Sequence, residues 1–382
     1  MKLILVSLSL LYGSDALVVS KTNAIPKIGR VSAGPIDISA MGVGTWSWGN
    51  RLLFDYDPSQ DEEIYESYRY IRDCGVSIFD TADSYGTLDL NGRAEILLGQ
   101  FERRYLKEKE SMNFVEVEDP GFFSFLSPKS KTSTPPPPQQ VATKLAPYPW
   151  RITPQSMVNS VKGSLRRLEQ DQLCLAQLHW STVNYQPFQE KALWEGIADT
   201  YDLGLCQAVG VSNYGPKQFQ KICEYMKERE VPLATAQIQY SLMTYDFAKD
   251  MNAVCEEQNV RLISYSPLCL GLLTGKYNLD NLPKGATNPR RQLFRELLPG
   301  AQNLLNTLEA IGNDLGKSQT QVAINWALCK NTVPITGIRT LEQAKENLGA
   351  YEFRLDAGMV EELDRAALSV GKPMIQNVFQ TD

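Results

Sequence analysis

Four side chains that could move protons stand at or just beyond the ends of apolar, strand-like runs in this 382-residue chain. Asp80 ends "VSIFD" and Tyr85 follows five residues later, whereas Lys144 ends "VATK" and His179 follows "LAQL". An ammonium group beside a phenol lowers the phenol's pKa from its ordinary value of about 10. Asp80 would be the counter-ion of a buried Lys144, and His179 would orient a substrate oxygen. The set predicts that Tyr85 donates a proton to an oxygen, as carbonyl reduction requires.

This group of residues contains no serine or cysteine nucleophile, and His179 is the only histidine of the chain. The seven cysteines are widely spaced and form no CxxC pair, so we expect neither a disulfide framework nor a metal site. Since no side chain can supply hydride to a carbonyl carbon, the chemistry requires a redox cofactor. Other polar residues that end or follow apolar runs are Ser212, Asn213, Gln237, Tyr265 and Ser266.

The elements that would position these residues alternate along the chain. Apolar strand-like runs, from "IDISAMGVGTW" to "NTVPITG", alternate with stretches whose apolar residues recur every three or four positions. About eight such units predict a single-domain (β/α)8 TIM barrel, whose reactive groups lie at the C-terminal ends of the strands. The first strand is the least defined, because a short hairpin fits before it. An open doubly wound sheet is the alternative, but the chain lacks its GxGxxG turn.

Two segments depart from this alternation. Residues 111–140 are long and rich in proline, which predicts an irregular loop inserted in a barrel domain of residues 37–382. Residues 1–36 combine a signal-like apolar run with a basic, acid-poor stretch, which predicts a removable presequence like the two-part ones of complex plastids. A secretory signal and a cytoplasmic protein are the alternatives, and the cysteines favour a reducing compartment.

The overall charge excludes some partners. The net charge is −6 and no long basic stretch occurs, so we expect no nucleic-acid partner. The N-terminal apolar run is too short to span a bilayer comfortably, so we expect no membrane association of the mature chain. The sequence leaves the oligomeric state open.

Taken in order, the motifs resemble those of the aldo-keto reductase superfamily over about residues 40–375, apart from the insertion. The motifs are "GVGTWSWG", "FDTADSYG", "VATK", "LAQLHW", "VGVSNYGP", "AQIQYSL", "SYSPLCLGLLTGKY" and "PITGIRTLEQAKENLGA". The chain is most similar to the plant chloroplast-type members, including pyridoxal-reductase-like ones, through "WSWGN", "YPWR" and "MIQNVFQT". The resemblance implies reduction of an aldehyde or ketone, with pyridoxal as a candidate, by NADPH and the acid Tyr85. It also implies that Lys144 and Asp80 tune Tyr85, while His179 positions the carbonyl.

The same resemblance implies how the barrel holds NADPH. Ser212, Asn213 and Gln237 would bind the carboxamide, and Tyr265 would stack on the nicotinamide. Lys276 would meet the pyrophosphate, and the planar fork of Arg339 would bind a 2′-phosphate, near a helix start that favours anions. The full expected cofactor set is Thr45, Trp46, Asp80, Ser212, Asn213, Gln237, Tyr265, Ser266, Pro267, Leu268, Gly271, Lys276, Gly337, Arg339, Gln343, Glu346 and Asn347.

Aromatic residues are expected to wall the substrate site. Trp46, Trp48 and Trp180 lie in the motifs beside the expected catalytic residues, and Tyr85 and His179 complete the set. Aromatic walls suit flat or apolar carbonyl compounds.

The sequence offers two alternative functions. Tyr105 and Lys109 have the Y-x-x-x-K spacing of short-chain dehydrogenases, but they lie in "RRYLKEKE", a charged helix end without a glycine fingerprint before it. The second alternative is an NADP(H)-binding regulatory subunit with little turnover, in which a complete catalytic set can also occur.

Overall fold

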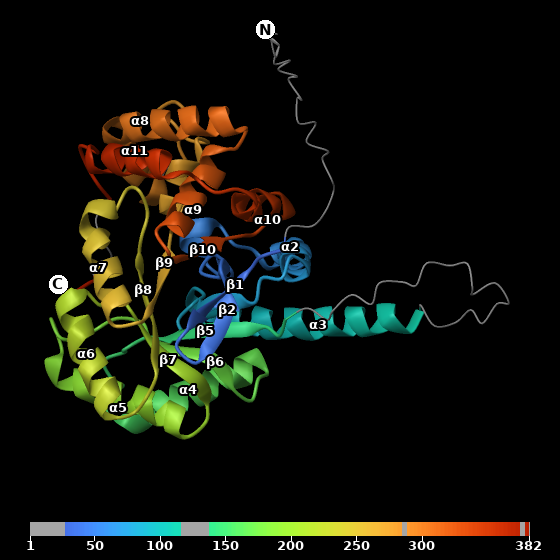
Figure 1. Ribbon diagram of the computed structural model, residues 1–382. Coiled ribbons are helices and arrows are strands. Elements are labelled where there is room, and N and C mark those ends of the chain that lie inside the picture. Colours follow the sequence, from blue (N-terminus) through green and yellow to red (C-terminus); the bar gives the residue numbers. More distant parts are fainter. Residues whose placement is uncertain (1–26, 116–136, 285–288, 375–378, 382) are drawn as a thin grey trace, which may run out of the picture.

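The computed structural model describes residues 27–115, 137–284, 289–374 and 379–381. A closed parallel barrel forms the centre, with the strand order β10-β3-β4-β5-β6-β7-β8-β9, and helices surround it (Figure 1). The predicted (β/α)8 TIM barrel is therefore confirmed. Its strands are β3 (Gly42–Gly44), β4 (Ile78–Ala82), β5 (Gln140–Leu145), β6 (Leu173–Leu178), β7 (Cys206–Ser212), β8 (Leu233–Gln239), β9 (Arg261–Tyr265) and β10 (Val333–Gly337).

The helices begin at the caps that the sequence provides. Thr153 accepts a hydrogen bond from Ser156 N and is followed by Pro154, which suits a first helical position. Ser318 and Gln321 form a capping box. The described helices are α1 (Arg51–Phe54), α2 (Asp61–Asp73), α3 (Arg93–Val115), α4 (Pro154–Leu168), α5 (Pro187–Asp202), α6 (Pro216–Glu228), α7 (Tyr245–Glu257), α8 (Pro289–Leu315), α9 (Gln319–Cys329), α10 (Leu341–Leu348) and α11 (Ala357–Leu368).

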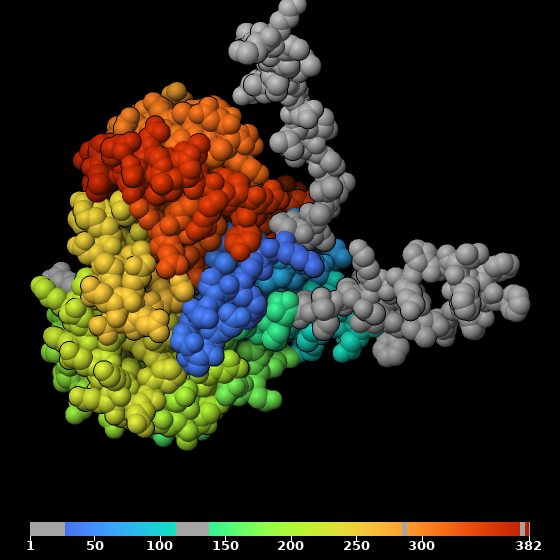
Figure 2. All heavy atoms as spheres, viewed as in Figure 1, coloured from blue at the N-terminus to red at the C-terminus, as the bar shows by residue number. Residues whose placement is uncertain are grey.

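A hairpin before the barrel closes its N-terminal end. β1 (Arg30–Ala33) pairs antiparallel with β2 (Ile36–Ser39). Ala33, Ile36 and Ile38 are buried in one apolar cluster with residues such as Ile78 and Ala142, from the first halves of barrel strands. The hairpin (blue in Figure 2) fills the centre of the visible face. The folded part thus starts before the expected boundary at residue 37, and residues 1–26 of the expected presequence lie outside the described residues.

The expected insertion joins a helix to the start of a strand. Residues 111–115 continue α3 rather than beginning a loop, and β5 starts at Gln140. Residues 116–136 lie outside the described residues. β5 begins at the N-terminal face of the barrel, opposite the face where such barrels hold their active sites.

None of the helices in the described ranges combines the length and the apolar character that crossing a bilayer demands.

Candidate active site

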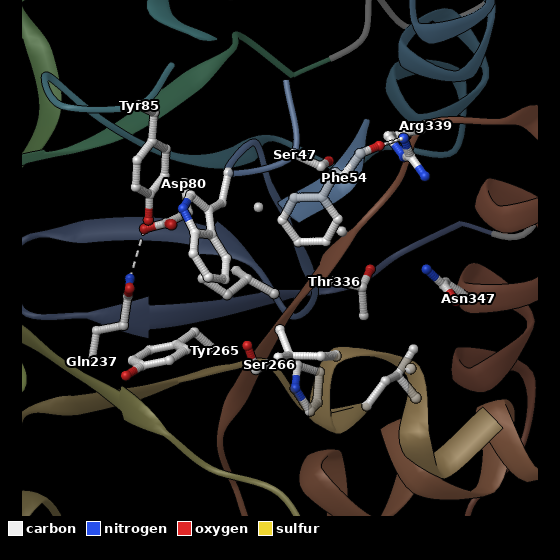
Figure 3. A pocket seen from close by; sticks show the side chains of 18 of the residues that line it. Ser47, Phe54, Asp80, Tyr85, Gln237, Tyr265, Ser266, Thr336, Arg339 and Asn347 are labelled. Carbon is white, nitrogen blue, oxygen red and sulfur yellow. Dashed lines mark hydrogen bonds between the residues drawn. The ribbon is translucent and has the colours of Figure 1, made fainter. Parts of the chain in front are cut away.

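A cavity of about 660 Å³ opens at the C-terminal ends of the barrel strands. Its two sides differ in chemistry: Tyr85 and Gln237 lie on one side, and Arg339 and Asn347 lie on the other (Figure 3). The expected site residues that line it are Trp46, Asp80, Tyr85, Lys144, His179, Trp180, Ser212, Asn213, Gln237, Tyr265, Ser266, Pro267, Leu268, Gly271, Lys276, Gly337, Arg339, Gln343, Glu346 and Asn347.

A buried ion pair lies at the base of this cavity. β4 and β5 are neighbours with Ala82 opposite Lys144, so both strands deliver their charged residues to one place. Lys144 Nζ lies 2.5 Å from Asp80 Oδ2, and Gln237 Nε2 donates to Asp80 Oδ1 at 2.6 Å. Both charged side chains are almost fully buried, which makes each dependent on the other for neutralisation.

Tyr85 lies beside this ion pair but keeps its proton. Lys144 Nζ is 5.1 Å from the centre of the Tyr85 ring. Burial raises the pKa of Tyr85 well above its ordinary value, and the charge of Asp80 and the neighbouring Tyr265 raise it further. The pKa of Lys144 is lowered, mainly because burial penalises its charge. The expected net lowering of the Tyr85 pKa is therefore wrong, because burial and the charge of Asp80 outweigh any stabilisation of the phenolate by Lys144.

His179 completes the group from the end of β6. Its ring centre lies 5.8 Å from that of Tyr85. The main chain of His179 is fixed, because its N–H donates to Leu145 O at 3.1 Å and its carbonyl accepts from Asn213 Nδ2 at 2.9 Å. Burial, followed by the charge of Lys144, lowers the pKa of His179 well below 6.5. The imidazole is therefore neutral near pH 7, and its buried Nδ1 has no hydrogen-bond partner among the described residues.

The ends of β7 and β9 form a second polar cluster. Tyr265 donates its hydroxyl hydrogen to Asn213 Oδ1 at 2.8 Å, and Asn213 Nδ2 also contacts Ser212 Oγ at 3.2 Å. Asn213 holds a left-handed conformation with φ of 60°, which asparagine tolerates better than most residues. These bonds fix the amide of Asn213, and the ring of Tyr265 lines the cavity.

Cationic side chains mark the other side of the cavity, where Lys276, Arg290 and Arg339 line the wall. Arg339 Nη1 donates to Phe54 O at 2.6 Å. The Phe54 ring lies near both guanidinium groups, with its centre 5.9 Å from Arg290 Cζ and 6.0 Å from Arg339 Cζ. Thr340 caps the start of α10 directly after Arg339. This side therefore offers positive charge and a helix N-terminus, both of which attract phosphate.

Two expected site residues do not line the cavity. Trp48 is fully buried, donates Nε1–H to Ile338 O at 2.8 Å and packs edge-on against Phe101. Thr45 is also fully buried, and its hydroxyl donates to Asp80 O at 3.0 Å, which joins the end of β3 to β4. The chain turns at residues 46–49, so Trp46 and Trp48 enter different surroundings although they are two residues apart.

Several lining residues were not expected from the sequence. Trp180 stacks on Phe379 with ring centres 4.3 Å apart, so the C-terminal tail contributes to the aromatic side. The "NPRR" pair of arginines at the start of α8 was a usable signal for Arg290. The missed residues are Gly44, Ser47, Phe54, Ser84, Leu270, Thr274, Tyr277, Arg290, Thr320, Ile335, Thr336 and Phe379.

Comparisons with known proteins identify the family of this chain. The Aldo/keto reductase family model matches residues 40–367. "Pyridoxal reductase, chloroplastic" of Arabidopsis thaliana is 45% identical over 353 residues, which cover 92% of this chain and 89% of the relative. The "NADH-specific methylglyoxal reductase" of Escherichia coli is 25% identical over 354 residues, which cover 88% of this chain and 98% of the relative.

Solved structures have the same fold. A thermostable aldo-keto reductase in complex with the inhibitor epalrestat aligns with a TM-score of 0.64 and 22% identity, over 89% of this chain and 100% of that one. A silkworm (Bombyx mori) aldo-keto reductase complexed with NADPH aligns with a TM-score of 0.62 and 23% identity, over 89% and 88% of the two chains. The chain belongs to the aldo/keto reductase family and is an oxidoreductase that acts on carbonyl or CH–OH groups.

Proposed function

We propose that this chain reduces an aldehyde or ketone to the alcohol with NADPH, and that Tyr85 donates the proton. The observation that carries the proposal is the convergence of Asp80, Tyr85, Lys144 and His179 beside one cavity at the C-terminal ends of β4, β5 and β6.

The cavity residues fit NADPH. Lys276, Arg290 and Arg339 supply positive charge for the phosphate groups, with Arg339 suited to a 2′-phosphate through its planar fork. At the other side, the Tyr265 ring offers a stacking surface and Asn213 offers an amide held in place by hydrogen bonds. When bound, NADPH supplies the hydride for the carbonyl carbon. The silkworm reductase of the same fold, solved with NADPH, supports this choice.

The residues of this chain supply the proton for the reduction. The protonated Tyr85 hydroxyl donates its hydrogen to the carbonyl oxygen as that oxygen gains negative charge. A neutral His179 can donate a second hydrogen bond to the same oxygen, which orients the carbonyl. The Lys144 ammonium, held by Asp80, stabilises the phenolate left on Tyr85. Solvent then returns a proton to Tyr85.

The substrate side of the cavity suits a flat, aromatic aldehyde. The centre of the Trp180 ring lies 4.8 Å from that of the His179 ring, Trp180 stacks on Phe379, and Trp46 lines the same cavity. The name of the Arabidopsis relative supports pyridoxal, an aromatic aldehyde, as the first substrate to test.

The proposed location is a plastid. The relative from Arabidopsis is described as chloroplastic, and residues 1–29 contain the signal-like apolar run followed by Lys21 and Lys27. Fusion of residues 1–29 to a fluorescent protein tests this, because β1 begins at Arg30. Fluorescence in plastids supports the proposal, whereas secretion or a diffuse cytosolic signal contradicts it.

A substrate screen tests the function. The purified protein should consume NADPH, followed by its absorbance, in the presence of pyridoxal or a nitrobenzaldehyde. Tight NADPH binding without oxidation across a broad carbonyl panel would favour the regulatory-subunit alternative instead.

A further inference from the structure

We propose that Asp83 is a positioning residue that holds Tyr85 against Lys144 by tying together the loops that follow β4 and β5. This inference rests on the proposed function, because it assigns Asp83 a role in placing the proton donor. We call residues 83–92 the β4 loop and residues 146–153 the β5 loop.

Asp83 bridges the two loops through both carboxylate oxygens. Oδ1 accepts a hydrogen bond from Ala146 N at 3.1 Å, and Oδ2 lies 2.6 Å from Arg151 Nη1. The main chain adds a third link, since Asp83 N donates to Lys144 O at 2.9 Å. The Asp83 side chain is only 3% exposed, and Asp83 is not among the residues that line the cavity. It can therefore act on the reaction only through the residues that it holds.

Arg151 makes the β5 loop rigid around this carboxylate. Its Nη1 donates to Ala146 O at 2.6 Å, which closes the loop on itself, and its Cζ lies 4.8 Å from the centre of the Tyr148 ring. Gln189 of α5 donates to Tyr148 O at 2.8 Å and to Arg151 O at 2.9 Å. The β5 loop is thus anchored to a helix on one side and to Asp83 on the other.

The position of the bridge in the chain explains its effect. Asp83 precedes Tyr85 by two residues, and Ala146 follows Lys144 by two residues. Tyr85 N donates to Ala82 O at 3.1 Å, and Tyr85 O accepts from Gly92 N at 2.9 Å, so the backbone of Tyr85 moves with its loop. The Asp83 bridge therefore sets the separation between the phenol and the ammonium group.

The bridge consists of two buried charges that neutralise each other. Burial raises the pKa of Asp83, whereas the charge of Arg151 opposes that rise. Removing the carboxylate charge would leave the largely buried Arg151 guanidinium without its counter-ion, which is costly in a poorly solvated site. Loss of the Asp83 charge should therefore shift the β5 loop away from the β4 loop and also lower the stability of the protein.

Matched variants distinguish a role of Asp83 in positioning Tyr85 from a general role in the stability of the protein. Asp83→Asn keeps the size of the side chain but removes its charge, and the double variant Asp83→Asn/Arg151→Met also removes the unpaired cation. Asp89→Asn is the control, because Asp89 lies in the same loop and pairs with Arg51 at 3.0 Å in an exposed ion pair. For each, we would measure the thermal midpoint, the NADPH Kd, and kcat with an aromatic aldehyde.

Asp83→Asn should lower kcat about 10- to 100-fold, the usual effect of misplacing a reacting group, without changing the NADPH Kd. The double variant should regain thermal stability but not kcat, and Asp89→Asn should match the wild type. Recovery of kcat together with the thermal midpoint, or a wild-type kcat in Asp83→Asn, would overturn the proposal.

Amide hydrogen exchange distinguishes this failure from failure of the proposed function. Asp83→Asn and the double variant should speed exchange in residues 83–92 and also in residues 144–151, and Asp89→Asn should leave residues 144–151 unchanged. If the wild type reduces no carbonyl compound, the proposed function fails, while linked exchange still supports the bridge. Unchanged exchange in residues 144–151 of both Asp83 variants would rule the bridge out.

Discussion

At the residue scale, the proposed reaction depends on protonation states that burial imposes. Tyr85 retains its proton because burial and the charge of Asp80 raise its pKa, and His179 remains neutral because burial and Lys144 lower its pKa. At neutral pH, Tyr85 is therefore protonated and can donate a proton, and His179 is neutral and can donate a hydrogen bond. The sequence identified these residues by type and place, but the direction of the Tyr85 pKa shift depends mainly on the burial of its hydroxyl group, which the sequence does not reveal.

The pH profile of the reduction follows from these directions. Reduction requires protonated Tyr85, so the rate should fall only as pH rises through a pKa above the ordinary 10.0. His179 titrates well below 6.5, so no loss of activity should begin near that pH. We expect kcat/KM to stay level between about pH 6.5 and about pH 9. A decline centred between these limits would contradict the account.

His179 also makes stability depend on pH. Its pKa in the folded chain lies well below the value of 6.5 expected on unfolding, so the unfolded chain binds the additional proton. Its contribution to the free energy of unfolding is full above about pH 6.5 and is lost as pH falls below that value. His179 is the only histidine, so His179→Gln removes the only imidazole from the pH dependence of stability. Between about pH 7.5 and about pH 5.5, the free energy of unfolding should therefore fall less in this variant than in the wild type. Urea unfolding at both pH values measures the difference. Parallel losses would contradict this.

At the element scale, strand ends were predictable and loops were not. Asp80, Lys144 and Gln237 follow apolar residues that fix their strands, and each strand continues only one or two residues beyond them, so their convergence follows from the barrel alone. Arg290 and Phe379 reach the cavity from the start of α8 and from the C-terminal tail, and their placement depends on long-range packing. Trp48 was misplaced because a turn after β3 breaks the relation between residues two apart.

The segment between β10 and α10 should determine the choice of cofactor. Arg339 precedes the cap of α10 and lines the cationic side of the cavity. Arg339→Met should weaken NADPH binding about 10- to 100-fold through loss of a charge-assisted bond to the 2′-phosphate, and NADH binding should hardly change. The control is Arg365→Met, which alters an exposed arginine of α11. Titration of both cofactors gives the two Kd values, and equal weakening of both would remove the 2′-phosphate role.

At the scale of the whole molecule, the two ends of the barrel differ in role: one end is closed by packed apolar residues and the other holds the cavity. The β1–β2 hairpin closes the N-terminal end, and the cavity opens at the C-terminal ends of the strands. The barrel itself was predictable from the alternation of strands and helices. The short hairpin expected before the first barrel strand is also present. The expected boundary at residue 37 nevertheless cut through it, because its four-residue strands carry too little periodicity to fix where the folded part starts.

This difference in role predicts that residues 116–136 do not contribute to catalysis. The described elements on either side of them are α3 and β5, and β5 begins at the N-terminal face of the barrel, away from the cavity. A Gly/Ser linker of the same length is flexible and should leave kcat and KM at wild-type values. A change in KM with pyridoxal or a nitrobenzaldehyde would show that this segment reaches the substrate side.

The central claim is that Tyr85 supplies the proton, and Tyr85→Phe tests it most directly. This change removes one hydroxyl group and keeps the ring that lines the cavity. Measured side by side with the wild type, the variant should lose about 10²- to 10⁴-fold in kcat for carbonyl reduction and should bind NADPH with an unchanged Kd. Wild-type turnover in the Phe variant would contradict the account, because another group would then be the acid.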